Sequence, residues 1–219
     1  ASSVILCRVV SRNPQRFRDL LLSGPVKLIQ ADPFAEDQLA TALKGCDAAI
    51  NLVGILNETG AGNQFHRVHV ELGNRVLDGC RSAGVNRLLH MSALNANEAS
   101  GPSVYLKTKG EAEDILRREA GADLDWTIFQ PSVIFGPGDS FTNRFASLLR
   151  LSPLLLPLAK PNARLAPVFV GDVVAAFLRC LDDPACFSQT YQLCGPQVVS
   201  LRELVQIIAD ATATRRRVI

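Results

Sequence analysis

Tyr105 and Lys109 are the two side chains whose types and spacing most directly suggest chemistry. Pro102 and Ser103 precede them and predict the start of a helix, in which residues four apart lie on one face. An ammonium beside a phenol favours the phenolate, so the pair predicts a tyrosine of lowered pKa that exchanges protons near neutral pH. Lys109 can also hold a sugar hydroxyl. A surface tyrosine followed by a solvated lysine has the same spacing, so the surrounding elements must decide between the two interpretations.

Strand-like and helix-like segments alternate up to Phe135. Apolar and β-branched runs predict the strands, and apolar residues at helical spacing predict the helices between them. This alternation predicts an α/β fold, with a doubly wound, parallel, Rossmann-type sheet covered by helices on both faces. The expected strands are 4–10, 26–30, 47–53, 86–91 and 125–129, and the expected helices are 14–22, 35–43, 64–83 and about 102–120.

Ligands of such sheets bind beyond the carboxyl ends of the strands. Polar or small residues follow most of the expected strands, namely Ser11 and Arg12, Asp32, Asn51 to Gly54, Ser92, and Pro131 with Ser132. The helix with Tyr105 and Lys109 follows the strand that ends near Ser92. One edge of the sheet therefore gathers residues suited to a ligand, which favours the functional interpretation of the pair.

The pattern changes after Phe135, where Gly136-Pro137-Gly138 predicts a turn. Shorter elements follow, with helices expected at 141–151, 171–181 and 201–211 and strands at 166–170 and 189–194. Asp172 precedes an apolar helix and is expected to be its N-cap. We therefore expect a sheet domain over residues 1–135 and mainly a small α/β lobe over residues 136–219, which closes over a cleft.

Composition excludes several classes of protein. The net charge of +2 is too small for a nucleic-acid footprint, and the basic run Arg215-Arg216-Arg217 predicts a solvated tail. No apolar stretch approaches 18 residues and no signal-peptide pattern is present, so we expect no transmembrane segment and an intracellular location. His66, His69 and His90 lack partners at metal spacing and are expected to be satisfied polar groups rather than metal ligands. The six cysteines form no C-x-x-C pair and lie mostly in apolar runs, so we expect reduced core thiols (Cys7, Cys46, Cys80, Cys180, Cys186 and Cys194).

Five segments agree in order and spacing with a known superfamily: Asn51-Leu52-Val53-Gly54, Leu89 to Ala93, Tyr105-x-x-x-Lys109, Phe129 to Gly136, and Pro167 to Val173. They resemble the extended or atypical branch of the short-chain dehydrogenase/reductase superfamily. Within it, the sequence is most similar to the group of the NAD(P)H-binding accessory subunit of respiratory complex I and its bacterial relatives. That likeness is carried by residues 51–56, 66–70, 105–109 and 135–141.

The resemblance implies a dinucleotide-binding Rossmann domain over residues 1–135 and a substrate-side lobe over residues 136–219. It implies catalytic roles for Tyr105, Lys109 and Ser92. The implied cofactor-binding residues are Arg12, Asp32, Asn51, Val53, Gly54, Tyr105, Lys109, Pro131, Ser132 and Val133.

Three of these residues have particular expectations. Arg12 follows the second strand of the family, where an acidic residue would bind the ribose of NAD, so NADP(H) is favoured over NAD(H). Asp32 could accept a hydrogen bond from the adenine, but Asp before Pro is also an ordinary turn former. Asn51 is expected to be a structural hydrogen-bonding group at a strand end more than a cofactor ligand.

The sequence departs from the family in two places. The glycine-rich loop that holds the pyrophosphate is absent from these residues. A sheet that lacked its first, central strand would leave the neighbouring strands with open edges and should not be stable. We therefore infer that these residues omit that strand as well as the loop. The family's serine commonly lies where Ala93 and Leu94 stand, and Ser92 is the nearest substitute.

Three functions are therefore considered. The first is a protein of the complex I accessory-subunit type, peripheral to an energy-transducing membrane, that binds NADPH with weak or no turnover. The second is an active NAD(P)-dependent oxidoreductase, or an epimerase or dehydratase of nucleotide sugars, in which Tyr105 transfers a proton and Lys109 holds the nicotinamide ribose. The third is a redox-sensing interaction module in which the nucleotide stabilises the fold.

Overall fold

The computed structural model describes residues 5–35, 37–59, 62–151, 155–213 and 217–218. It divides into two compact units, the first made of residues 1–128 and 186–189 and the second of residues 129–185 and 190–219. Strands β5 (Asp125–Pro131) and β10 (Gln189–Leu193) each contribute residues to both units. Arg215 and Arg216 of the expected basic tail lie outside the described residues.

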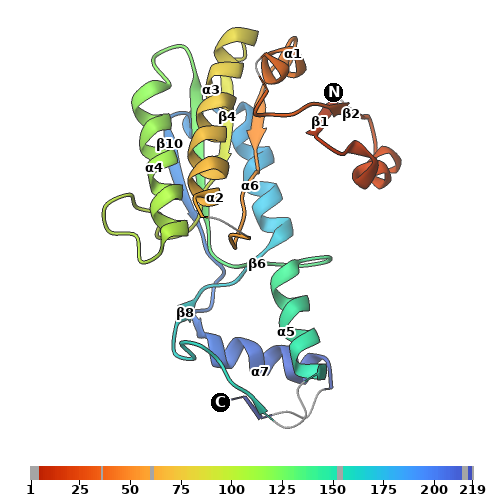
Figure 1. Ribbon diagram of the computed structural model, residues 1–219, viewed down its shortest axis with the longest axis vertical. Helices are drawn as coiled ribbons and strands as arrows, with labels where there is room; N and C mark the ends of the chain where they lie inside the picture. The colour runs from red at the N-terminus through yellow and green to blue at the C-terminus, as the bar shows by residue number, and fades with distance from the viewer. Residues whose placement is uncertain (1–4, 36, 60–61, 152–154, 214–216, 219) are drawn as a thin grey trace. The chain divides into compact units, whose positions relative to one another are not determined.

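Four of the strands form one sheet in the order β10-β5-β4-β3 (Figure 1). β3 (Ala49–Asn51) pairs in parallel with β4 (Arg87–Met91), and Asn51 lies opposite His90. The predicted α/β class and parallel pairing are confirmed. β3 is shorter than the predicted segment 47–53, because the chain leaves the strand at Leu52 and begins a loop.

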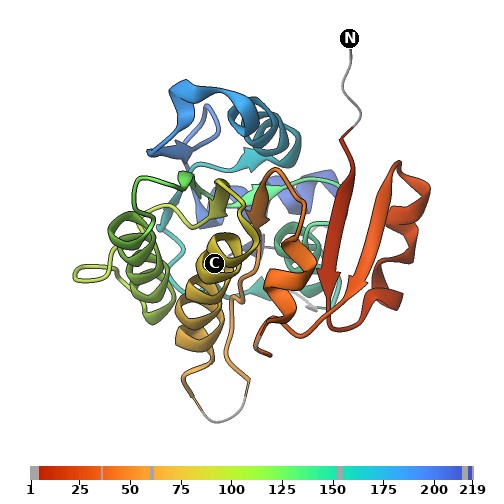
Figure 2. The same ribbon diagram turned by 90° about the horizontal axis from the view of Figure 1, so that it is seen from above.

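The first two strands form a separate sheet (Figure 2). β1 (Cys7–Ser11) and β2 (Val26–Gln30) pair in parallel, and the segment between them is a 3-10 helix, η1 (Pro14–Leu22). Arg8 Nη1 donates hydrogen bonds to the carbonyls of Lys44 at 2.6 Å and Ala42 at 3.3 Å, which joins β1 to the end of α1 (Gln38–Leu43). Among the described residues, β1 and β3 each have one strand partner.

Two long helices of the first unit pack on the strand residues of that unit. The predicted helix 64–83 is divided into α2 (Gln64–His66), a π-helical turn η2 (Arg67–Glu71) and α3 (Leu72–Ala83), and α4 (Val104–Glu119) follows β4. Gly84 ends α3 with a φ of 72°, a left-handed conformation that suits glycine at a C-cap. The predicted apolar face of α3 packs with residues from β4, β5 and α4 in one core (Leu72, Val76, Leu77, Cys80, Leu88, Leu116 and Ile128).

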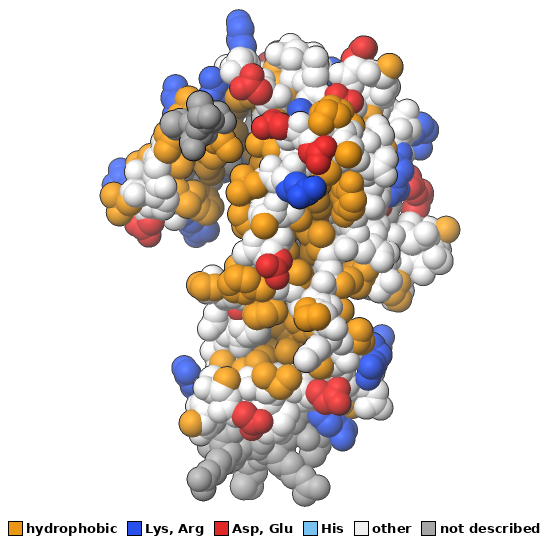
Figure 3. Space-filling model, turned by 180° about the vertical axis from the view of Figure 1, so that it is seen from behind, with side chains coloured by type: hydrophobic (Ala, Val, Ile, Leu, Met, Phe, Trp, Pro, Cys, Tyr) orange, Lys and Arg blue, Asp and Glu red, His pale blue; other side chains and the backbone are white. Residues whose placement is uncertain are grey.

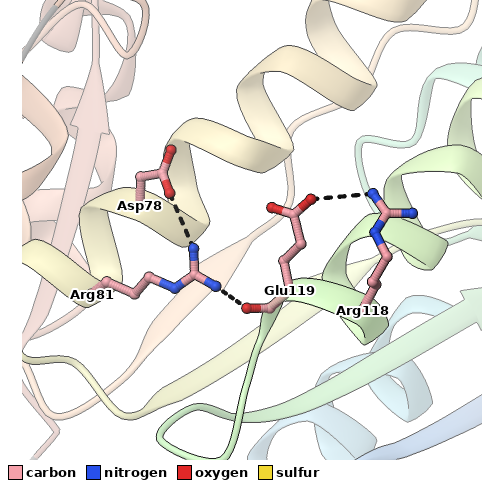
Figure 4. Close-up of polar contacts among 4 residues, drawn as sticks. All are labelled: Asp78, Arg81, Arg118 and Glu119. Carbon is pink, nitrogen blue, oxygen red and sulfur yellow. Dashed lines mark hydrogen bonds and ion pairs between the residues drawn. The ribbon is translucent and has the colours of Figure 1, made fainter.

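The carboxyl ends of α3 and α4 are joined by polar contacts (Figure 4). Arg81 pairs with Asp78 at 3.3 Å and donates a hydrogen bond to the carbonyl oxygen of Glu119. Arg118 pairs with the Glu119 carboxylate at 3.1 Å. Exposed ion pairs contribute about 0–1 kcal/mol each, so the apolar core, and not these contacts, holds the two helices on the sheet.

In its described residues, the second unit contains the helices α5, α6 and α7 and several short strands. α5 (Ser140–Leu151) and α7 (Leu201–Ala211) share a core that includes Leu149 and Val205. Ser200 and Glu203 form a capping box at the start of α7. The remaining elements are β6 (Ile134–Phe135), β7 (Leu155–Leu156), β8 (Arg164–Leu165), β9 (Val168–Phe169), α6 (Val170–Asp182), η3 (Pro184–Cys186), β11 (Val199–Ser200) and β12 (Arg217–Val218).

Two predictions about these elements are wrong. The N-cap of α6 is Phe169, so Asp172 lies inside the first turn, where its carboxylate faces the positive end of the helix dipole instead of capping it. Cys7 and Cys194 are exposed, because one opens the edge strand β1 and the other follows β10.

Apolar side chains are also exposed on the surface, as the view from behind shows (Figure 3). On α6, Val174 is 51% and Leu178 is 56% exposed, while Val173 and Phe177 of the same helix are buried. No helix in the described part of the chain is both long enough and apolar enough to cross a membrane.

Candidate functional site

Helix α4 carries the Tyr105–Lys109 pair, and its start is set by Ser103. The Ser103 hydroxyl accepts a hydrogen bond from the Leu106 N–H at 3.2 Å, which is the geometry of an N-cap. The predicted helix start is therefore confirmed. Tyr105 lies in the first turn and Lys109 one turn later, directed toward the carboxyl ends of β3 and β4 by the contacts described next.

Lys109 is buried at these strand ends, with only 4% of the residue exposed. Its Nζ donates to the carbonyl of Met91 at 3.0 Å and approaches that of Val53 at 3.5 Å. Burial lowers the pKa of Lys109 to about 8, although the charge of Glu113 acts in the opposite direction. The lysine thus joins the end of β4 to the loop after β3.

That loop, residues 52–55, is attached at its start by Asn51. The Asn51 Oδ1 accepts a hydrogen bond from Val53 N–H at 3.1 Å, and its Nδ2 lies 3.2 Å from His90 Nδ1. These contacts agree with the structural role expected for Asn51. Gly54 lies close to the lysine, because a Cβ there would be 3.2 Å from Lys109 Nζ, a contact that would require a shift of a few tenths of an ångström.

Tyr105 packs against aromatic rings instead of the ammonium. Its ring lies edge-on to His69, with 5.3 Å between centroids, and to Phe65, with 5.9 Å between centroids. Burial raises the pKa of Tyr105. The predicted lowering of this pKa by Lys109 is therefore wrong for the chain alone, because the ring is desolvated and the ammonium is bound to backbone carbonyls.

His69 was expected to be a satisfied polar group, and the structure confirms this. Its Nε2 accepts a hydrogen bond from Ile55 N–H at 3.3 Å, and its Nδ1 lies 2.9 Å from Thr108 Oγ1. Sequence reasoning missed that these partners belong to the loop after β3 and to α4. No local pattern reveals them, because Thr108 is 39 residues away in sequence.

Ser92 follows Met91, whose carbonyl binds Lys109, and only 3% of this residue is exposed. Its hydroxyl and His90 Nε2 are buried and, within the described ranges, have no hydrogen-bond partner. Desolvation, followed by the charge of Lys109, lowers the pKa of His90 to about 3, so the ring is neutral at neutral pH.

The remaining candidate residues lie on other elements. Arg12 is exposed directly after β1, and Asp32 follows β2, where its Oδ1 accepts a hydrogen bond from Phe34 N–H at 3.0 Å in an ordinary Asx turn. Pro131, Ser132 and Val133 belong to the second unit.

Within that unit, the hydroxyl of Ser132 accepts a hydrogen bond from Ala166 N–H at 3.2 Å. In the first unit, the structure thus brings together Lys109, Val53 and Gly54 around the ends of β3 and β4, and Tyr105 lies one helical turn before Lys109 on α4.

A family model described as NAD(P)H-binding matches residues 3–143. The chain is 29% identical over 189 residues to the mitochondrial NADH dehydrogenase [ubiquinone] 1 alpha subcomplex subunit 9 of Arabidopsis thaliana, with 85% of this chain and 46% of that protein covered. It is 32% identical over 172 residues to the ceramide reductase of Caulobacter vibrioides, with 76% of this chain and 50% of that protein covered. The chain thus spans about half the length of these curated relatives.

Solved structures share the fold. MoeE5, solved in complex with UDP-glucose and NAD, superimposes with a TM-score of 0.79 at 22% sequence identity, covering 97% of this chain and 76% of that one. This likeness confirms the predicted Rossmann-type fold.

Proposed function

The chain belongs to the NAD(P)H-binding family, and we propose that its first unit binds a nicotinamide dinucleotide beside the carboxyl ends of β3 and β4. The observation that carries this proposal is the buried Lys109 ammonium, held by the carbonyls of Met91 and Val53 one helical turn from Tyr105. Such an ammonium can exchange a carbonyl for the hydroxyls of the nicotinamide ribose. Gly54 leaves the loop backbone open to close approach by a ligand.

We further propose that NADP(H) is preferred over NAD(H). Arg12 is exposed at the carboxyl end of β1, and a guanidinium can bind the 2′-phosphate through several hydrogen bonds. In this proposal Asp32 and Asn51 support the adenosine side of the site. The cofactor-binding roles of Pro131, Ser132 and Val133, which belong to the second unit, stay predictions from the sequence.

The proposed role is that of an accessory subunit of a respiratory complex, peripheral to an energy-transducing membrane, with weak or no turnover. The likeness to the Arabidopsis thaliana subunit supports it. The raised pKa of Tyr105 counts against oxidation of a hydroxyl substrate, because a tyrosine that works as a base needs a lowered pKa. The hydroxyl of Ser92, the nearest substitute for the family's serine, has no hydrogen-bond partner within the described ranges, which agrees with weak or no turnover.

A second candidate is an NAD(P)-dependent reductase acting on a carbonyl or hydroxyl substrate. The phenol of Tyr105 is protonated near neutral pH, and burial raises its pKa further, so it could donate a proton to the oxygen of a carbonyl whose carbon receives a hydride from the cofactor. The likeness to the Caulobacter vibrioides ceramide reductase favours this candidate over an epimerase or dehydratase of nucleotide sugars.

Titration of the full-length protein with NADPH and NADH tests these proposals. We expect NADPH to bind more tightly, Lys109→Met to weaken both nucleotides, and Arg12→Glu to remove only the preference for NADPH. Equal affinities for the two nucleotides in the wild type would refute the NADP(H) preference. Binding unaffected by Lys109→Met would refute the proposed site.

Turnover separates the two roles. An accessory role predicts no hydride transfer with ceramide-type substrates or nucleotide sugars, and unchanged nucleotide affinity in Tyr105→Phe. Turnover by the wild type that Tyr105→Phe abolishes would establish the reductase instead.

A further inference from the structure

His69 lies where three segments of the first unit meet: the π-helical turn η2, the loop after β3, and helix α4. Only 2% of the residue is exposed. One ring nitrogen accepts the Ile55 N–H at 3.3 Å, and the other lies 2.9 Å from the Thr108 hydroxyl. The imidazole therefore connects segments that are far apart in sequence.

These contacts define the state of the ring. Because Nε2 accepts a hydrogen bond, the neutral imidazole carries its proton on Nδ1 and donates it to Thr108 Oγ1. The Thr108 hydroxyl can then donate to the carbonyl of Val104 at 3.0 Å or of Tyr105 at 3.1 Å. Burial, and then the charge of Lys109, lower the pKa of His69 to about 4, which keeps the ring neutral near pH 7.

The same ring supports Tyr105. It stands perpendicular to the phenol ring, at an interplanar angle of 83°, and is stacked on Phe65 at 28° with 5.5 Å between centroids. The π-helical turn adds a residue to the turn from which His69 projects, and such turns occur frequently at functional sites.

The loop after β3 thus has three consecutive attachments. Val53 N–H is bound by Asn51, the Val53 carbonyl lies 3.5 Å from Lys109 Nζ, and Ile55 N–H is bound by His69. Gly54, at the middle of the loop, has no side chain to fix its position. Loss of the His69 contact would release the loop at Ile55 and leave only the attachments at Val53.

We propose that His69 is a positioning residue of the dinucleotide site. Its side chain holds the loop after β3 (residues 52–55) against α4 and fixes the orientation of the Tyr105 ring. This inference rests on the proposed function, because the loop and the Tyr105–Lys109 pair form the proposed nucleotide site. A neutral side chain with one acceptor and one donor is required, since the loop offers an N–H and Thr108 offers a hydroxyl oxygen.

The test uses the variants His69→Leu and His69→Gln of the full-length protein. Glutamine keeps an acceptor and a donor, whereas leucine removes both at similar volume. For His69→Leu we expect exchange of the Ile55 amide to accelerate at least about tenfold and the NADPH affinity to fall about tenfold, as expected for lost hydrogen bonds. For His69→Gln we expect both values to return most of the way to those of the wild type.

His66→Leu is the matched control, because His66 lies one turn earlier and its ring nitrogens face other residues, with Nδ1 3.6 Å from Glu71 Oε1 and Nε2 3.3 Å from Glu111 Oε1. It should leave the Ile55 amide and the NADPH affinity unchanged. A purely structural role of His69 would lower the melting temperature of both His69 variants without selective recovery by glutamine.

Two results would overturn the inference: a protected Ile55 amide in His69→Leu, or no recovery in His69→Gln. A wild-type protein that binds neither NADPH nor NADH would instead refute the proposed function. In that case the Ile55 exchange and a spectroscopic titration of Tyr105 still decide whether His69 holds the loop and the ring.

Discussion

Lys109 combines contacts within the fold with a proposed role in ligand binding. Its ammonium is almost completely buried, and its bonded partner is the carbonyl of Met91, with that of Val53 nearby. Carbonyl oxygens neutralise a charge less well than a carboxylate, so burial dominates and lowers the lysine pKa to about 8. The Lys109 charge is therefore only partly compensated within the chain, although the charge of Glu113 acts to raise the pKa.

This lowered pKa has a measurable effect on stability. As pH rises from about 8 to 10.5, the folded lysine loses its proton before the unfolded one does, so the unfolded state binds more protons and the free energy of unfolding increases. We expect this increase to be about 3 kcal/mol larger for the wild type than for Lys109→Met. Denaturant unfolding followed by circular dichroism at several pH values measures it, and parallel profiles of the two proteins would contradict the prediction.

Among elements, those with strong local signals were predicted well. β2 and α7 have the predicted bounds, because Pro25 and Ala31 flank the former and the Ser200–Glu203 capping box starts the latter. The π-helical turn at residues 67–71 was not predicted, since the apolar spacing there reads as one continuous helix. The helix start before Tyr105 was predicted from its own sequence. The contacts of Lys109 with Met91 and of His69 with Thr108 depend on tertiary packing and could not be predicted.

The loop before α4 also depends on packing, and it fixes how that helix lies. Asn97 N–H donates to the carbonyl of Leu106 at 3.1 Å, so the loop runs directly along the first turns of α4. Gly110, next to Lys109, makes this approach possible. A Cβ at position 110 would overlap the backbone of Asn97 and Glu98.

We therefore expect Gly110→Ala to destabilise the protein by about 1–3 kcal/mol, although alanine is the better helix former. Gly73→Ala is the matched control in α3, because its Cβ would meet Ala112 Cβ at 3.8 Å, an ordinary contact. There alanine should stabilise by about 0.5–1 kcal/mol. Thermal and denaturant unfolding measure both effects, and equal shifts for the two variants would show that the loop does not constrain α4.

At the scale of the whole molecule, two buried histidines link folding to pH. His69 and His90 both belong to the first unit, and burial is the main cause of the lowered pKa of each, to about 4 and about 3 respectively. Each ring is neutral when folded and titrates near its ordinary value of 6.5 when unfolded. Below that pH the unfolded chain binds more protons, so the free energy of unfolding falls as the solution becomes more acidic.

His90→Gln isolates one of these contributions, because glutamine cannot take up a proton in this range. Between about pH 6.5 and pH 4, we expect the wild type to lose about 1.4 kcal/mol per pH unit more than the variant, whatever the difference between them at neutral pH. Denaturant unfolding at several pH values measures both slopes. Equal slopes would mean that His90 is already protonated in the folded molecule. The contact with Asn51 would then need a different explanation, because a protonated Nδ1 cannot accept a hydrogen bond from the Asn51 amide.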